Sequence, residues 1–132
     1  MSVRTASCRC GALQATCTGA PVRISVCHCL DCQKRSGSAF AAQARWPEGQ
    51  VAVTGAYTTY ETLADSGRWG RYNFCPTCGD TVFYTNELFP GRIAVPLGAF
   101  ADPSFPAPKH SVFEDRKHGW VELTGDDWSR QA

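Results

Sequence analysis

The sequence contains no long hydrophobic run and no strong excess of charge of one sign. No stretch reaches the roughly eighteen apolar residues that a membrane-spanning helix requires. Thirteen Lys and Arg residues against twelve Asp and Glu residues leave a formal net charge of +1. Such a chain has no broad field to attract nucleic acid or an anionic membrane surface. We therefore expect neither a membrane partner nor a nucleic-acid partner.

The beginning of the chain shows no secretory signal. Residues 1–8 have no apolar core and no small-residue cleavage site. The expected location is therefore the cytoplasm, where thiols stay reduced. The 132 residues are 43% hydrophobic and 19% charged, which predicts one folded domain over residues 1–132 rather than a disordered tail or a coiled coil.

Short β-rich runs, separated by twelve Gly and eight Pro residues, predict a mainly β domain. Apolar–polar alternation and turn residues predict strands at 13–17, 22–26, 40–46, 50–54, 57–63, 70–74, 81–85, 92–97, 111–113 and 119–123. The one predicted helix is short and covers 30–35. Three Pro residues in 101–109 predict an extended surface loop there.

Cysteine is abundant, with eight residues beside a single Met. Seven of them form three groups along the chain, and Cys17 stands apart. The groups are Cys8 and Cys10; Cys27, Cys29 and Cys32; and Cys75 and Cys78. Clustered cysteines in a reducing compartment favour metal binding, and a disulfide framework is the alternative if the protein is exported without a recognisable signal.

The first and third groups each end on Cys-Gly. Gly11 and Gly79 permit the positive φ of a tight turn that aims backbone N–H groups at a thiolate. Two such turns supply four thiolates, enough for a closed tetrahedral zinc site. The sequence therefore predicts a structural zinc at Cys8, Cys10, Cys75 and Cys78. The alternative is a pair of ordinary buried thiols in each turn.

The middle group offers three thiolates and no evident fourth ligand. In an extended segment Cys27 and Cys29 point to one face and His28 to the other, while Cys32 returns from the start of the helix. Catalytic zinc keeps an open position, so this group is the candidate for chemistry. Two alternatives stay open: a closed site completed by Cys17 or His28, and a metal-free redox cluster.

Three thiolates around Zn²⁺ leave a net charge of −1, which weakens the ion as a Lewis acid and suits the exchange of a soft sulfur ligand. Lys34 and Arg35 follow the group and could hold a substrate carboxylate or be solvated side chains. Ser36 and Ser38 are further candidates to contact a ligand near the metal.

The order and spacing of these groups resemble the glutathione-dependent formaldehyde-activating enzyme family, also called the centromere protein V family. The resemblance rests on the runs at 8–11, 27–40 and 71–79 and on a late Trp120. It implies one zinc-binding domain of the Mss4-like type, in which folded β-sheets are stapled by zinc. Asp80 and Asn73 depart mildly from the family pattern.

The resemblance also implies two zinc ions per chain: a structural one in the four-cysteine set and a second, labile or catalytic, at Cys27, Cys29 and Cys32. The family's activity is that of a carbon–sulfur lyase, which joins glutathione and formaldehyde reversibly as S-hydroxymethylglutathione. Glutathione is then the expected small-molecule partner. The alternatives are a thiol-binding carrier without turnover and a zinc-ribbon interaction module.

Overall fold

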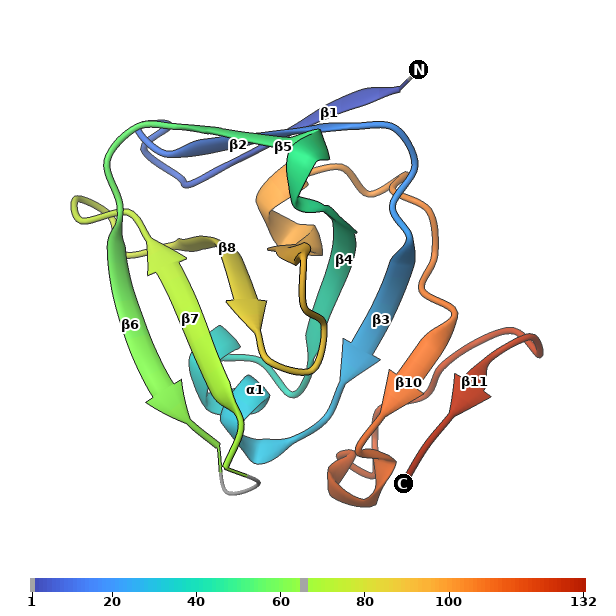
Figure 1. Ribbon diagram of the computed structural model, residues 1–132. Coiled ribbons are helices and arrows are strands. Elements are labelled where there is room, and N and C mark those ends of the chain that lie inside the picture. The colour runs from blue at the N-terminus through green and yellow to red at the C-terminus, as the bar shows by residue number, and fades with distance from the viewer. Residues whose placement is uncertain (1, 65–66) are drawn as a thin grey trace.

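The computed structural model describes residues 2–64 and 67–132, which form two β-sheets, one α-helix and three short 3-10 helices. The smaller sheet has the strand order β1-β2-β5 and is antiparallel. The larger has the order β11-β10-β3-β4-β9-β8-β7-β6 and is antiparallel except where β10 pairs with β3 and β11. Figure 1 shows the small sheet across one end of the large, curved sheet, with α1 at the other end.

The strands are β1 (Val3–Ser7), β2 (Gln14–Thr18), β3 (Arg23–Cys27), β4 (Ala41–Pro47), β5 (Val51–Thr54), β6 (Thr58–Leu63), β7 (Trp69–Phe74), β8 (Thr81–Asn86), β9 (Arg92–Pro96), β10 (His110–Val112) and β11 (Ser129–Arg130). The helices are α1 (Leu30–Ser36), η1 (Glu48–Gln50), η2 (Leu97–Phe100) and η3 (Glu114–Arg116). The prediction of a mainly β fold with a short helix after the second cysteine group is confirmed.

Two parts of the strand prediction were wrong. The segment 119–123 is irregular, because the Val121 N–H closes a turn onto the His118 carbonyl instead of joining a strand. Trp120 in this segment is 75% exposed. Strands β1 and β11 were missed, since their residues show no clear hydrophobic alternation: Ala6 alone of β1 is buried, and both residues of β11 are exposed.

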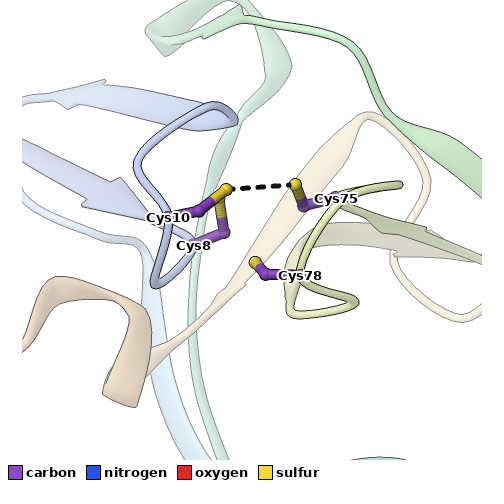
Figure 2. Close-up of side chains that lie close together, drawn as sticks. All are labelled: Cys8, Cys10, Cys75 and Cys78. Carbon is purple, nitrogen blue, oxygen red and sulfur yellow. Dashed lines mark hydrogen bonds between the residues drawn. The ribbon is translucent and has the colours of Figure 1, made fainter.

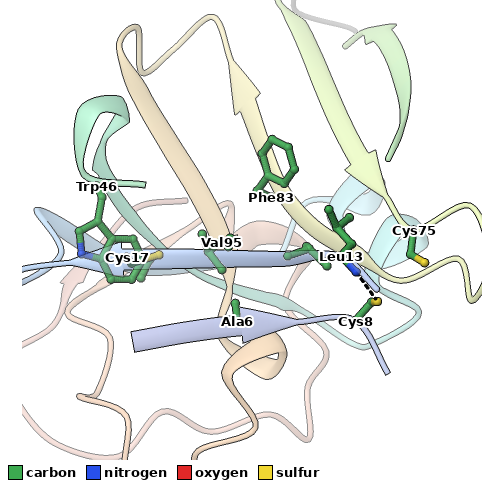
Figure 3. Packing of buried hydrophobic residues seen from close by; sticks show 11 residues of the cluster. Ala6, Cys8, Leu13, Cys17, Trp46, Cys75, Phe83 and Val95 are labelled. Carbon is green, nitrogen blue, oxygen red and sulfur yellow. Dashed lines mark hydrogen bonds between the residues drawn. The ribbon is translucent and has the colours of Figure 1, made fainter. Parts of the chain in front are cut away.

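The hydrophobic core lies between the two sheets. Figure 3 shows Ala6, Leu13 and Cys17, from the β1–β2 hairpin, near Trp46 and Val95 from the large sheet. All five side chains are fully buried. Trp46 also donates a hydrogen bond from Nε1 to the Gly19 carbonyl at 2.9 Å, which satisfies its one polar atom.

Alternation along β4 gives the large sheet two different faces. Ala44 and Trp46 face the core, whereas Gln43 and Arg45 line a cavity on the other side. Both polar side chains are buried, with exposed fractions of 3% and 6%. One face of the sheet therefore packs against the core, and the other face forms the polar wall of a cavity.

Within the described ranges, no helix combines the length and the apolar character needed to cross a bilayer.

Candidate metal centres and the cavity

Two turns bring the four-cysteine cluster together. Cys8 and Cys10 lie in the turn between β1 and β2, and Cys75 and Cys78 lie in the turn between β7 and β8. Figure 2 shows the four side chains pointing toward one another from the two turns. Their Sγ atoms all lie within 4.8 Å of one another. The sequence prediction that these residues converge therefore agrees with the structure.

The spacing of these sulfurs fits a tetrahedral metal site. The Cys10 Sγ lies 3.6 Å from the Cys8 Sγ and 3.6 Å from the Cys75 Sγ. A tetrahedron with zinc–sulfur bonds of about 2.3 Å has an edge of about 3.8 Å, close to these distances. The cluster can therefore hold a metal ion without rearrangement of the backbone.

Backbone amides favour the thiolate form of Cys8, Cys75 and Cys78. The Leu13 N–H donates to the Cys8 Sγ at 3.3 Å, and the Thr77 N–H donates to the Cys75 Sγ at 3.4 Å. The Leu13 hydrogen bond lowers the pKa of Cys8 from its ordinary value. Backbone N–H groups of Asp80 and Cys10 likewise lower the pKa of Cys78.

The glycines of the two turns have the predicted conformation. Gly11 has φ of 81° and Gly79 has φ of 83°, in the left-handed region that side chains disfavour. A Cβ atom at either position would meet nothing within 4 Å. These glycines are therefore required by the backbone conformation of the turn and not by crowding.

Asp80 connects the two turns directly. It accepts hydrogen bonds from the Arg9 backbone N–H at 2.9 Å and from Arg9 Nε at 3.1 Å. The Arg9 side chain and backbone N–H lower the pKa of the Asp80 carboxyl below its usual value. The departure from the family pattern noted at Asp80 is thus an ion pair across the four-cysteine cluster, which sequence reasoning could not pair because 71 residues separate the partners.

The second cluster lies where β3 ends and α1 begins. The Sγ atoms of Cys27, Cys29 and Cys32 all lie within 4.8 Å of one another. Cys29 is the N-cap of α1, and its Sγ accepts a hydrogen bond from the Cys32 N–H at 3.3 Å. The strand end and the first helical turn therefore aim the three sulfurs at one point.

Three close thiols cannot all ionise without a cation beside them, because like charges repel. Hydrogen bonds from Cys27 and Cys32 lower the pKa of Cys29 to about 2. The hydrogen bonds with Cys29 and Cys32, followed by burial, raise the pKa of Cys27. A bound cation would remove this conflict, so the donor set fits a thiophilic metal such as zinc.

Neither residue considered as a fourth ligand joins this cluster. Cys17 lies in the core between the sheets, where burial raises its pKa to about 11. His28 is fully buried and its Nε2 lies 3.1 Å from the Ser111 Oγ. In the part of the chain that the structure describes, the cluster contains no histidine and no carboxylate besides the three thiols. The alternative of a closed site completed by Cys17 or His28 is therefore not supported.

A cavity of about 1100 Å³ borders the three-cysteine cluster. Cys27, Cys29 and Cys32 all line it, whereas none of the four cysteines of the other cluster does. The remaining walls come from β3, β4, β6, β7, β8, β10 and α1, from Ala64 and Arg68 between β6 and β7, and from the segments that follow β8, β10 and β11. The volume is sufficient for a ligand of tripeptide size. One cluster is thus enclosed by two turns, and the other opens onto a ligand-sized space.

The predicted substrate contacts divide between the cavity and the outer surface. Lys34 and Arg35 line the cavity, and the Arg35 guanidinium carbon lies 4.6 Å from the Tyr84 ring centroid and 5.1 Å from that of Tyr72. Ser36 and Ser38 are exposed at the end of α1, where the Ser36 Oγ accepts a hydrogen bond from the Ser38 N–H at 3.2 Å. Contact of these four residues with a substrate stays a prediction.

Sequence reasoning missed a polar network on the cavity floor. Gln43 Nε2 donates to the Ser25 Oγ at 2.7 Å, and the Tyr84 hydroxyl donates to Gln43 Oε1 at 3.0 Å. Arg23 and Arg45 lie beside this network. The available signal was the polar half of the alternation in 23–27 and 41–45, but the same pattern is common in antiparallel strands with one face toward solvent, so it does not point to a cavity.

Comparison with known proteins identifies the family. The model of the family described as "glutathione-dependent formaldehyde-activating enzyme" matches residues 3–116. The chain belongs to this family. The match covers all seven clustered cysteines. It ends before Trp120, one of the residues on which the sequence resemblance to the family was based.

A solved structure has a fold similar to that of this chain. The crystal structure of a Rhodobacter sphaeroides protein, a structural genomics target, superposes with a TM-score of 0.60 at 22% sequence identity. The alignment covers 75% of this chain and 91% of the other. At this identity the likeness concerns the fold alone. A search of curated proteins found no match.

Proposed function

We propose that the protein is a zinc-dependent carbon–sulfur lyase that joins glutathione, or a related thiol, to a small aldehyde and cleaves the adduct. The observation that carries this proposal is the opening of the Cys27–Cys29–Cys32 cluster onto the large cavity. Membership of the glutathione-dependent formaldehyde-activating enzyme family supports the choice of substrates.

The proposed reaction with formaldehyde is reversible. In the forward direction the thiol sulfur forms a bond to the carbonyl carbon, the carbonyl π electrons move to oxygen, and the proton lost by the thiol ends on that oxygen. The product is S-hydroxymethylglutathione. The reverse reaction breaks the carbon–sulfur bond and returns the proton to sulfur.

The three thiolates of Cys27, Cys29 and Cys32 would hold zinc, which would supply a soft Lewis acid that stabilises the substrate sulfur as a thiolate. Lys34 and Arg35 would bind substrate carboxylates through charge-assisted hydrogen bonds. The two tyrosine rings beside the Arg35 guanidinium orient it within the cavity wall. The four-cysteine cluster would hold the second zinc and tie the two turns together.

Exchange NMR on mixtures of glutathione and formaldehyde tests this function. We expect the zinc-loaded protein to accelerate exchange between free glutathione and S-hydroxymethylglutathione. The Cys29→Ser variant should lose the acceleration, whereas Cys17→Ala should keep it, because Cys17 lies in the core and lines no part of the cavity. An exchange rate unchanged by the native protein would overturn the lyase proposal. Saturable glutathione binding without acceleration would support the carrier instead.

A further inference from the structure

Two arginines lie directly opposite each other on the cavity floor. Arg23 of β3 is the register partner of Arg45 of β4, and both side chains line the cavity. Like charges at directly opposed positions of an antiparallel pair repel each other and destabilise the sheet. On the other flank of Arg45, its register partner in β9 is Ala94, which is small and uncharged. The sheet therefore holds a local concentration of positive charge that its own strands do not neutralise.

The part of the chain that the structure describes supplies no carboxylate to this pair. No ion pair of the described residues includes Arg23 or Arg45. Arg23 Nε is buried without a hydrogen-bond partner, and Arg45 Nη1 makes only a long contact of 3.4 Å with the Ser25 Oγ. Asp31 is the one carboxylate among the described cavity-lining residues. Guanidinium N–H donors therefore remain for a ligand.

An aromatic ring holds the two guanidinium groups in place. The Arg45 guanidinium carbon lies 4.0 Å from the Phe89 ring centroid, and that of Arg23 lies 5.3 Å from the same centroid. Contact with an aromatic ring engages the face of a guanidinium group, whereas its hydrogen-bond donors lie in its plane. Phe89 can therefore orient both arginines without using their donors.

The arginine pair and the three-cysteine cluster lie on the same face of β3. Arg23, Ser25 and Cys27 alternate along this strand, and all three line the cavity. Four residues at a rise of about 3.3 Å separate the Cα atoms of Arg23 and Cys27 by about 13 Å. The hydrogen-bonded Ser25 and Gln43 lie between the two ends. A ligand that contacts both the three-cysteine cluster and the arginine pair therefore needs sulfur at one end and an anionic group on the order of 10 Å away from it.

We propose that Arg23 and Arg45 form an anion-binding subsite that selects thiols bearing a carboxylate at the end remote from sulfur. The subsite is separate from the cation group of Lys34 and Arg35 on α1, and it makes Arg23 and Arg45 specificity-determining residues. Its role in thiol selection rests on the proposed function, whereas anion binding by the two arginines does not. Neutral thiols of similar size are then poor ligands.

The first experiment tests anion binding without a thiol. Succinate is titrated into the metal-loaded, full-length protein at constant ionic strength, and the Nε–Hε signals of the arginines are followed by NMR. We expect the Arg23 signal to shift saturably in the native protein and in Arg4→Gln. Arg4 is the matched control because its guanidinium carbon also lies near an aromatic ring, 5.0 Å from the Phe105 centroid, but outside the cavity. Arg45→Gln should abolish the shift.

The second experiment compares glutathione with its diethyl ester by calorimetry. The native protein should bind glutathione about tenfold or more tightly than the ester, as expected for a charge-assisted hydrogen bond. In Arg45→Gln this ratio should fall several-fold, to the discrimination that Lys34 and Arg35 still supply, with the affinity for the ester unchanged. The melting temperature of Arg45→Gln should equal or exceed that of the native protein, because the repulsion from Arg23 is removed. Arg23→Gln provides the same test if Arg45→Gln does not fold.

The outcomes separate the subsite from the proposed function. Succinate binding without binding of either thiol would support the subsite and count against the lyase. A glutathione-to-ester affinity ratio that is the same in the native protein and in Arg45→Gln, with no succinate-induced shift, would overturn the subsite and leave the lyase intact. A lowered melting temperature in both Arg→Gln variants with an unchanged affinity ratio would also overturn it, because the arginines would then be purely structural.

Discussion

Replacing Cys78 by Ser should strongly destabilise or unfold the protein, whereas replacing Cys29 by Ser should not. Cys78 belongs to the cluster that joins the β1–β2 turn to the β7–β8 turn, and Cys10 and Cys75 of this cluster are 65 residues apart. Metal binding there cross-links distant parts of a small domain, so its binding free energy adds to the free energy of unfolding. Cys29 instead borders the cavity and caps α1, a position where Ser is also a favoured residue.

The size of the effect follows from the ligand count. Structural zinc binds with about 10–16 kcal/mol at neutral pH, so an equal share for each of four thiolates is about 2.5–4 kcal/mol. The whole domain is expected to be stable by about 5–15 kcal/mol. At roughly 3 °C per kcal/mol, the loss of one thiolate lowers the melting temperature by about 10 °C. Complete loss of the metal would exceed the stability of many domains of this size.

Zinc content by mass spectrometry and thermal unfolding by circular dichroism measure both effects. We expect two zinc ions in the native protein and one in Cys29→Ser, with a melting temperature within about 3 °C of the native value. Cys78→Ser should be insoluble or melt at least about 10 °C lower. Cys17→Ala is the control, because it removes a buried thiol that is in neither cluster. This variant should keep both zinc ions.

Equal losses of melting temperature in Cys29→Ser and Cys78→Ser would refute the distinction between a closed structural cluster and an open one. Loss of zinc from Cys17→Ala would refute the assignment of the ligands, since Cys17 lies in the core.

Two further substitutions test the turns and the cavity floor. Gly79→Ala should lower the free energy of unfolding by about 1–2 kcal/mol, and with it the melting temperature, because Gly79 has a φ of 83°. Gly98→Ala is the control: a Cβ there also meets nothing within 4 Å, and the melting temperature should stay unchanged. Equal effects of the two substitutions would contradict the argument that the turn requires glycine. Tyr84→Phe should cost about 1 kcal/mol at pH 7 in urea unfolding, because Gln43 Oε1 loses its buried donor. Burial raises the pKa of Tyr84 above the ordinary 10.0, so the folded state keeps the phenol proton longer than the unfolded state. The stabilisation is therefore full below pH 10 and is lost as pH rises toward the folded pKa. A difference in the free energy of unfolding between the native protein and Tyr84→Phe that stays constant far above pH 10 would contradict the raised pKa.

Most strands could be predicted because their pattern is local. The alternation of Ala42, Ala44 and Trp46 marks β4 without reference to any other segment. The grouping of the cysteines was equally visible, because each group lies within one turn or at one strand end. The turn conformation of Gly11 and Gly79 also follows from neighbouring residues. Strand β1 could not be predicted in this way, since Ala6 alone of its five residues is buried and the sequence shows no alternation there.

The sequence by itself determined the mainly β class, the short helix and the division of seven cysteines into four and three. Only the tertiary structure decided that Arg23 lies opposite Arg45, that Asp80 meets Arg9 and that one cysteine cluster opens onto a cavity. The reason is physical. Local spacing sets the direction of a side chain, whereas register and cavities depend on which distant strands pair and how the sheet curves.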